Sequence, residues 1–173
     1  MFVDRSAVPN TAATQFSAPD ITSDVQETLD PVDPPECGPI FWGPKATQAG
    51  SISWSTLRST GASTNNDGRY FQLFLYVPAE RPDLKSLLGR CGTIKYKGTT
   101  SRASVLSLPG LPSWALATRV AAPGADGAGI IGLCRGIYVS VAFTEKPSGE
   151  LSPTDTDALV NLFNGQVAKL EAI

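Results

Sequence analysis

The chain has 173 residues, of which 42% are hydrophobic and 17% are charged, and its formal net charge at pH 7 is −2. It contains no histidine, which excludes a Ser-His-Asp triad, a Cys-His dyad, an H-E-x-x-H zinc site and histidine ligation of haem. The length is typical of one domain. No run approaches the roughly 18 apolar residues of a membrane span, so we expect membrane attachment only through an anchor outside this chain.

The acidic residues are concentrated at the start of the chain. Residues 1–44 carry seven acids and one base, whereas residues 45–173 carry a small excess of bases. That excess is far below the strongly basic footprint of nucleic-acid binders, so we expect no nucleic-acid partner. Residues 1–34 are rich in Pro, Ser and Thr and predict an irregular arm or tether, which leaves residues 35–173 as a single domain.

One stretch of this arm has helical spacing. Ile21, Val25 and Leu29 fall at i, i+4 and i+8, which predicts a short helix over residues 21–29. Asp30 would end it, because the proline that follows pushes this residue out of the helical region.

Two strand-like runs follow the arm. Residues 50–59 and 69–77 are rich in aromatic, aliphatic and Thr side chains, and the polar residues 60–68 between them end in an Asp-Gly turn signal. The pattern predicts a hairpin with a long loop. The second run carries apolar groups on both faces, which is typical of a central strand covered on both sides.

Two helices are predicted in the rest of the chain. Residues 82–91 carry an apolar stripe at helical spacing, and Ser152-Pro153 opens a terminal helix with an N-cap and a first-turn proline. The terminal helix has one apolar face, formed by Leu159, Leu162, Phe163, Val167 and Leu170.

Between the two helices lie short runs that are typical of strands, namely residues 93–97, 103–108, 114–121 and 130–143, with a small-residue loop at 123–129. The order of elements predicts an α+β fold, in which a mostly antiparallel sheet packs against two helices and carries the irregular N-terminal arm.

The string Gly127-Ala-Gly-Ile-Ile-Gly132 matches the G-x-G-x-x-G fingerprint of dinucleotide-binding folds. That fingerprint needs a strand before it and a helix after it. Here residues 123–126 break the preceding strand and residues 137–143 favour a strand over a helix. We therefore interpret the string as a glycine-rich loop that enters a strand, and we expect no cofactor.

Cys37, Cys91 and Cys134 contain no C-x-x-C pair, which excludes thioredoxin chemistry and a zinc ribbon. We expect one disulfide and one buried thiol. A Cys37–Cys91 bridge would hold the start of the domain to its first helix, and Cys134 lies inside an apolar run, as a core thiol does. The other interpretation is that Cys134 is a nucleophile, but the chain has no histidine to activate it.

Six residues are candidates for a binding site. Lys95 and Lys97 lie two apart and predict a basic patch on one strand face, either for an anion or lipid headgroup or as charges that protect an edge strand from pairing. Aromatic side chains either line an apolar cleft or simply fill the core, and we select four of them as ligand-binding candidates: Trp54, Phe74, Tyr76 and Trp114.

Nothing in the sequence favours catalysis. Neither G-x-S-x-G nor S-x-x-K occurs, and the carboxylates of residues 45–173 fall in predicted loops or helix ends, where a raised pKa is not expected. We predict no catalytic residues and no metal site.

Several of these features together resemble a known family. Asp33-Pro-Pro-Glu-Cys37 opens the domain, Leu87-Leu-Gly-Arg-Cys-Gly92 closes the first helix, and a strand-rich middle and an amphipathic last helix follow. This pattern resembles mycobacterial and other actinobacterial secreted envelope lipoproteins of unknown function. It is also similar to the extracellular sensor domains of mycobacterial Ser/Thr receptor kinases.

The resemblance implies a non-catalytic extracytoplasmic domain in the cell envelope, with Cys37 and Cys91 in disulfide positions and a cleft for a small or lipidic ligand. It departs from the kinase domains, which have two bridges, and from lipoproteins, because no anchor cysteine lies near the N-terminus. Two other hypotheses remain open. One is an accessory protein of an envelope lipid-export complex with a membrane-protein partner, and the other is an enzyme with an unrecognised carboxylate or Tyr/Ser site.

Overall fold

The structure is a computed structural model that describes residues 2–4, 15–23, 31–57, 68–146 and 151–173. Within these ranges, the side chains of residues 15–23, 54–57, 68–69 and 145–146 fall outside the description.

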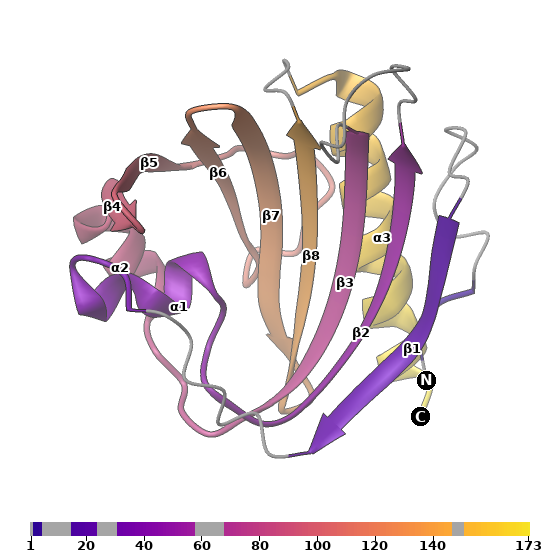
Figure 1. The fold of residues 1–173 in the computed structure, drawn as a ribbon. Helices are drawn as coiled ribbons and strands as arrows, with labels where there is room; N and C mark the ends of the chain where they lie inside the picture. The colour runs from indigo at the N-terminus through magenta and orange to yellow at the C-terminus, as the bar shows by residue number, and fades with distance from the viewer. Residues whose placement is uncertain (1, 5–14, 24–30, 58–67, 147–150) are drawn as a thin grey trace.

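The described residues form one eight-stranded sheet in the spatial order β1-β2-β3-β8-β7-β6-β5-β4 (Figure 1). All neighbouring strands are antiparallel. The strands are β1 (Gln15–Ser23), β2 (Ala46–Leu57), β3 (Gly68–Pro78), β4 (Thr93–Tyr96), β5 (Thr99–Val105), β6 (Leu116–Ala122), β7 (Ala125–Cys134) and β8 (Ile137–Lys146).

Three of the hairpins close with a two-residue turn that ends in glycine. Lys97-Gly98 and Arg135-Gly136 have positive φ at both residues (47° and 78°, 50° and 84°), which is the geometry of a type I′ turn. Pro123-Gly124 has positive φ only at its glycine (75°), as expected where proline precedes glycine in a type II turn. These turns make the second half of the sheet a continuous meander.

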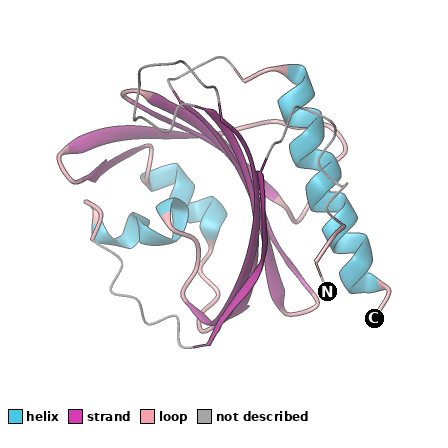
Figure 2. Cartoon of the chain, turned by 45° about the vertical axis from the view of Figure 1, so that its right-hand side comes forward, coloured by secondary structure: helices cyan, strands magenta, loops and turns pink. Residues whose placement is uncertain are grey.

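Helices cover both faces of the sheet. Figure 2 shows the sheet as a curved layer, with α3 (Pro153–Glu171) against its convex face and two short helices inside its concave side. The short helices are α1 (Gly38–Phe41), which follows the 3-10 turn η2 (Pro35–Cys37), and α2 (Leu84–Arg90).

The convex face carries the larger core. α3 begins with a capping box, in which Ser152 and Asp155 each accept a hydrogen bond from the other's backbone N–H. Its apolar face packs on side chains of alternate sheet positions. The buried members on the sheet are Ile52, Phe71, Leu73, Ala117, Ala128, Ile130, Cys134, Val139, Val141 and Phe143, and on the helix Ala158, Leu159, Leu162, Phe163, Val167 and Leu170.

A second core joins the short helices to the concave face. The Cys37–Cys91 disulfide links the end of η2 to the residue that follows α2, as the sequence predicts. Leu84, Leu87 and Leu88 of α2 are buried beside it. The apolar stripe of residues 82–91 is therefore confirmed as a core-facing helix surface.

Part of the N-terminal segment is ordered against the domain. β1 pairs with β2, and Asp33 exchanges two backbone hydrogen bonds with Lys95 of β4, at 2.9 and 2.8 Å. Val3 donates its N–H to the buried Gln166 of α3 at 2.9 Å. The division at residue 34 stays a prediction.

The predicted α+β class with an antiparallel sheet is confirmed, but four local expectations are wrong. Ile21 to Ser23 belong to β1 and not to a helix (residues 24–30 lie outside the described part), because pairing with β2 outweighs weak helical spacing. The expected loop 123–129 is mostly strand β7, and the run 130–143 is two strands, because the turn Arg135-Gly136 divides it. Lys97 lies in a turn and not on a strand face, and α1 was not predicted because it is only four residues long.

Candidate functional site

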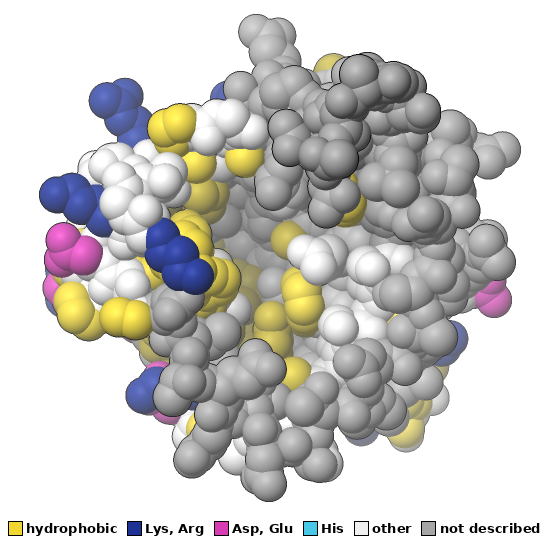
Figure 3. All heavy atoms as spheres, viewed as in Figure 1, with side chains coloured by type: hydrophobic (Ala, Val, Ile, Leu, Met, Phe, Trp, Pro, Cys, Tyr) yellow, Lys and Arg dark blue, Asp and Glu magenta, His cyan; other side chains and the backbone are white. Residues whose placement is uncertain are grey.

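The concave face of the sheet carries a cavity of about 550 Å³, a size typical of small-molecule sites. Figure 3 shows its mouth as a hollow with hydrophobic side chains inside. We call this cavity the trough. Its floor is formed by β3, β8, β7 and β6, and its roof by residues 39–43 of the α1 segment and by Leu84 of α2.

The strand register arranges the floor in rows across the sheet, since paired residues on neighbouring strands project to the same face. Each row therefore takes one residue from each of β3, β8, β7 and β6. The rows are Phe74, Ser140, Ile131 and Leu116; then Gln72, Ala142, Gly129 and Thr118; then Tyr70, Thr144, Gly127 and Val120.

Small residues in the middle of these rows create the depth of the trough. Ala142 and Gly129 are register partners in the central row. A Cβ built on Gly129 would meet only ordinary contacts, with the carbonyl oxygen of Val141 at 3.5 Å and Oγ1 of Thr118 at 3.6 Å. The floor there is nearly bare backbone, so the space above it belongs to the cavity and not to a packed core.

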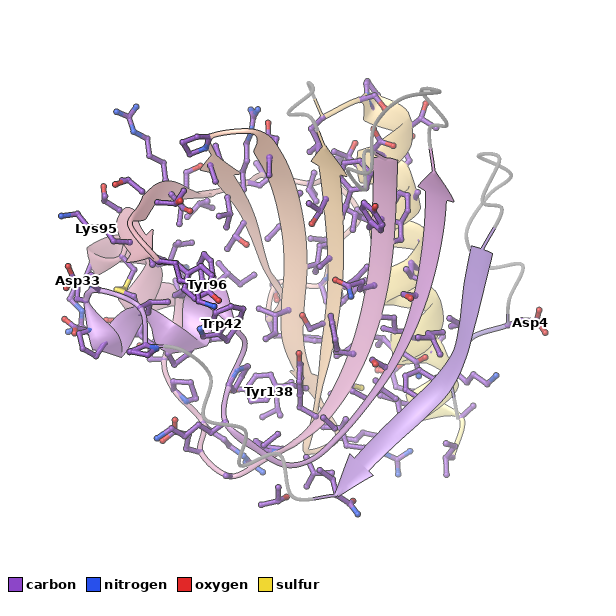
Figure 4. All side chains as sticks on the ribbon, viewed as in Figure 1. Asp4, Asp33, Trp42, Lys95, Tyr96 and Tyr138 are labelled. Atoms are coloured by element: carbon purple, nitrogen blue, oxygen red, sulfur yellow. A yellow bond between two sulfur atoms is a disulfide. The ribbon has the colours of Figure 1, made fainter. Side chains whose placement is uncertain are left out.

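Aromatic rings enclose one end of the trough. The Trp42 ring packs edge-on against Phe41 and Tyr96, with centroids 4.6 and 5.0 Å apart. Phe74 and Tyr76 stack on the facing strand at 5.7 Å. Figure 4 shows Trp42 and Tyr96 side by side at the α1 and β4 side of the sheet. The Cys37–Cys91 bridge ties this roof to α2.

The polar groups of the trough are neutral. Gln72, Ser101, Thr118, Ser140 and Thr144 contribute one amide and four hydroxyls among its lining residues. Each of these groups can both donate and accept hydrogen bonds.

Among the described lining residues, Asp126 is the acid. By strand alternation its side chain faces the convex side, with Ala128 and Ile130, where it forms an ion pair with Arg119. No described Lys or Arg lines the trough.

Two tyrosines lie next to each other in the β3–β8 register below the aromatic roof, namely Tyr76 and Tyr138. Burial raises the pKa of both phenols above the ordinary value, and the Arg81 charge offsets part of the rise for Tyr138. Both side chains therefore stay uncharged at neutral pH.

The six predicted ligand-binding residues are not in one place. Phe74 and Tyr76 line the trough. Trp114 lies on the convex side, where its ring meets Phe163 of α3 at 5.7 Å. Lys95 is exposed on β4, and the Lys97 ammonium lies 5.3 Å from the centre of the Tyr96 ring. Trp54 belongs to β2, and its side chain is outside the described part.

Sequence reasoning missed most of the trough floor. Gln72, Thr118, Gly129, Ser140 and Ala142 carry no motif, and their proximity depends on which strands pair. A signal did exist in β7, where Gly127 and Gly129 alternate with the larger Ala128 and Ile130. The fingerprint-like glycines thus lie inside a strand, at positions that open space on one face.

Cys134 is free and buried on the convex side. Desolvation raises the pKa of its thiol, the Glu171 charge raises it further, and the Arg135 charge lowers it. Such a thiol is mostly protonated at neutral pH and is a poor nucleophile.

Two features are absent from the described residues. No cluster of three or more Cys, Asp or Glu residues with metal-ligand spacing occurs among them. No described helix is long and apolar enough to cross a membrane.

No protein-family model matches the sequence, and no curated protein matches it. Among solved structures, the chain is similar to the extracellular domain of PknH from Mycobacterium tuberculosis, with a TM-score of 0.56 and 13% sequence identity. The alignment covers 99% of this chain and 93% of that one. At this identity the likeness concerns the fold alone, and in fold the chain resembles this extracellular domain.

Proposed function

We propose that this chain is a non-catalytic extracytoplasmic domain of the actinobacterial cell envelope that holds a small or lipidic ligand in the trough. The observation that carries this proposal is the trough itself, a cavity of about 550 Å³ with an aromatic roof, a floor of small residues and a few neutral polar groups. Ligand sites in proteins commonly combine an apolar lining with a small number of placed polar groups.

Two observations support the compartment. The fold resembles an extracellular domain, and the Cys37–Cys91 bridge is of a kind that persists in oxidising compartments. Membership of the secreted lipoprotein family is part of the proposal and rests on the sequence pattern alone.

The other two hypotheses have less support. An accessory protein that acts only by docking needs a large exposed apolar patch and no cavity. An enzyme needs at least two titratable groups in reach of one another in a polar cleft. Among the described lining residues, the acidic or phenolic side chains are those of Asp126 and Tyr76, and the Asp126 carboxylate is paired with Arg119 on the opposite face.

The trough can be tested with the uncharged dye Nile red, whose fluorescence rises in apolar surroundings. Ala142→Leu adds a side chain over the central row, whereas Ala121→Leu adds the same side chain at an exposed position on the other face of β6. We expect wild type and Ala121→Leu to bind the dye with equal affinity. Ala142→Leu should bind it about tenfold more weakly or worse, which corresponds to about 1.4 kcal/mol.

Circular dichroism of the three proteins checks that each is folded. Wild-type protein that leaves the dye fluorescence unchanged would contradict the proposal. So would a folded Ala142→Leu variant that binds the dye as wild type does.

A further inference from the structure

The trough extends along the strands that form its floor. The floor runs along β7 from Ile131 to Ala125, six residue steps, and along β8 from Ser140 to Thr144. At about 3.4 Å per residue, the β7 side spans about 20 Å, and the four strands of the floor span about 14 Å between the outer strand axes. A cavity of this length accommodates an extended hydrocarbon chain.

The two ends of the trough differ in polarity. One row holds Phe74, Ser140, Ile131 and Leu116, and its one polar side chain is that of Ser140. This row belongs to the end covered by the aromatic roof, because Trp42 packs in the same cluster as Leu116 and Ile131. The following rows bring Gln72, Thr118 and Thr144 to the other end.

Burial of a charge in this site would have no compensation from the described lining residues. Gln72 is exposed and Thr118 and Thr144 are half-buried, so a carboxylate or ammonium group at this end loses part of its hydration and finds no opposite charge among the described lining residues. The ammonium of Lys97, a candidate from the sequence for contact with an anion or head group, lies over the Tyr96 ring at 5.3 Å from its centre. An uncharged head group with hydroxyl or ester oxygens, in contrast, matches the Thr and Gln groups as both donor and acceptor.

The geometry points to an elongated, uncharged amphiphile as the ligand: one hydrocarbon chain under the aromatic roof and a hydroxyl- or ester-bearing head group at Gln72, Thr118 and Thr144. Monoacylglycerols have this chemistry. The inference rests on the proposed function, because it assigns a ligand class to the same trough.

The test compares three amphiphiles with the same chain length and different head-group charge: 1-monopalmitoylglycerol, palmitate and hexadecyltrimethylammonium. Each is titrated below its micelle concentration at pH 7.4 against the Nile red complex of the wild-type protein. We expect monopalmitoylglycerol to displace the dye at a concentration at least about tenfold lower than either ion, which corresponds to about 1.4 kcal/mol.

A double variant tests the polar end. Thr118→Val combined with Thr144→Val keeps the shape of both side chains and removes their hydroxyls. Thr100→Val is the control, because Thr100 is an exposed residue of β5 that pairs with Lys95 of β4. The double variant loses two hydrogen bonds to the head group, so it should bind monopalmitoylglycerol at least about tenfold more weakly than wild type does. Thr100→Val should bind both monopalmitoylglycerol and Nile red as wild type does, and circular dichroism checks that the double variant is folded.

The outcomes separate this inference from the proposed function. If the dye fails to bind wild type, the trough itself is refuted. If the dye binds but none of the amphiphiles displaces it, or palmitate displaces it as well as monopalmitoylglycerol does, the trough stands and the ligand class is wrong. If the double variant binds monopalmitoylglycerol as wild type does, the assignment of the polar end is wrong.

Discussion

At Gly132 the sheet offers bare backbone to its convex side, and the ring of Trp114 fills the space where a side chain would lie. A Cβ on Gly132 would come within 2.6 Å of Cε3 of Trp114 and within 3.2 Å of Phe163. Gly129, three residues earlier, faces the trough and has only ordinary contacts at the same position. Two glycines of one strand thus serve opposite faces, one for close packing and the other for open space.

This difference predicts the effect of adding one methyl group. Gly132→Ala forces the Trp114 ring to move and should lower the free energy of unfolding by about 1–3 kcal/mol, as overpacking does. Gly129→Ala is the matched control, since it makes the same chemical change on the same strand without a clash. Urea denaturation measures both. Equal stability of the two variants would show that Trp114 does not depend on the glycine.

Single residues were the least predictable level of the structure. The aromatic side chains of Phe74 and Tyr76 were selected as candidates for an apolar cleft, and both line the trough. Trp114 looked the same in sequence, but it lies on the other face, because its partner is a glycine 18 positions later. Side-chain type does not reveal which face a residue takes when the pairing of its strand is unknown.

Short elements control how the roof is held over the trough. α1 has only four residues and η2 three, too few for stability on their own. The Cys37–Cys91 bridge fixes this segment to α2, and Phe41 and Trp42 then pack on Tyr96. The roof therefore depends on the disulfide more than the sheet does.

Loss of the bridge should affect stability and binding together. Cys37→Ser with Cys91→Ser should lower the free energy of unfolding by about 2–4 kcal/mol, the usual worth of a disulfide that closes a loop of this kind. Nile red affinity should fall as well, because the aromatic roof is released. Cys134→Ala is the control and should keep wild-type dye binding, since Cys134 packs on the convex side. Thermal melts and dye titrations report both effects, and a double variant that binds the dye normally would contradict this view of the roof.

The elements themselves were largely predictable where their pattern is long. α3 was predicted from its cap and its apolar face, and β2 and β3 from their composition. β7 and β8 were merged into one run, because the Arg135-Gly136 turn has only two residues and one of them is a large charged side chain at positive φ. Arg135 also donates to the last carbonyls of α3, Leu170 at 3.3 Å and Glu171 at 3.2 Å, a contact no local pattern indicates.

On the scale of the whole molecule, two cores share one sheet. In the described part of the chain, β3, β6, β7 and β8 join the α3 core to the roof core, because their alternate residues enter one or the other. Antiparallel pairing and the α+β class follow from the element order, which is why they could be predicted. The trough could not, because it depends on the pairing of β3 with the distant β8 and on a roof from the α1 and α2 segments, none of which a local pattern reveals.

The shared sheet predicts cooperative unfolding. Tryptophan fluorescence reports on Trp42 in the roof, Trp114 on the convex face and Trp54 of β2, whereas far-UV circular dichroism reports on the whole sheet. We expect the two urea transitions of the oxidised protein to coincide, as in two-state unfolding of a single domain. A fluorescence transition at lower urea would show that one core unfolds separately.

The docking of the chain's first residues on its last helix has a mechanical consequence. The Phe2 carbonyl accepts a hydrogen bond from Lys169 at 2.6 Å, and the N and C ends lie side by side in Figure 1. A pulling force applied to both ends would therefore load this contact and the Val3–Gln166 hydrogen bond first, before any strand pair of the floor. Tension between the two ends therefore does not reach the strands that form the trough until these two hydrogen bonds break.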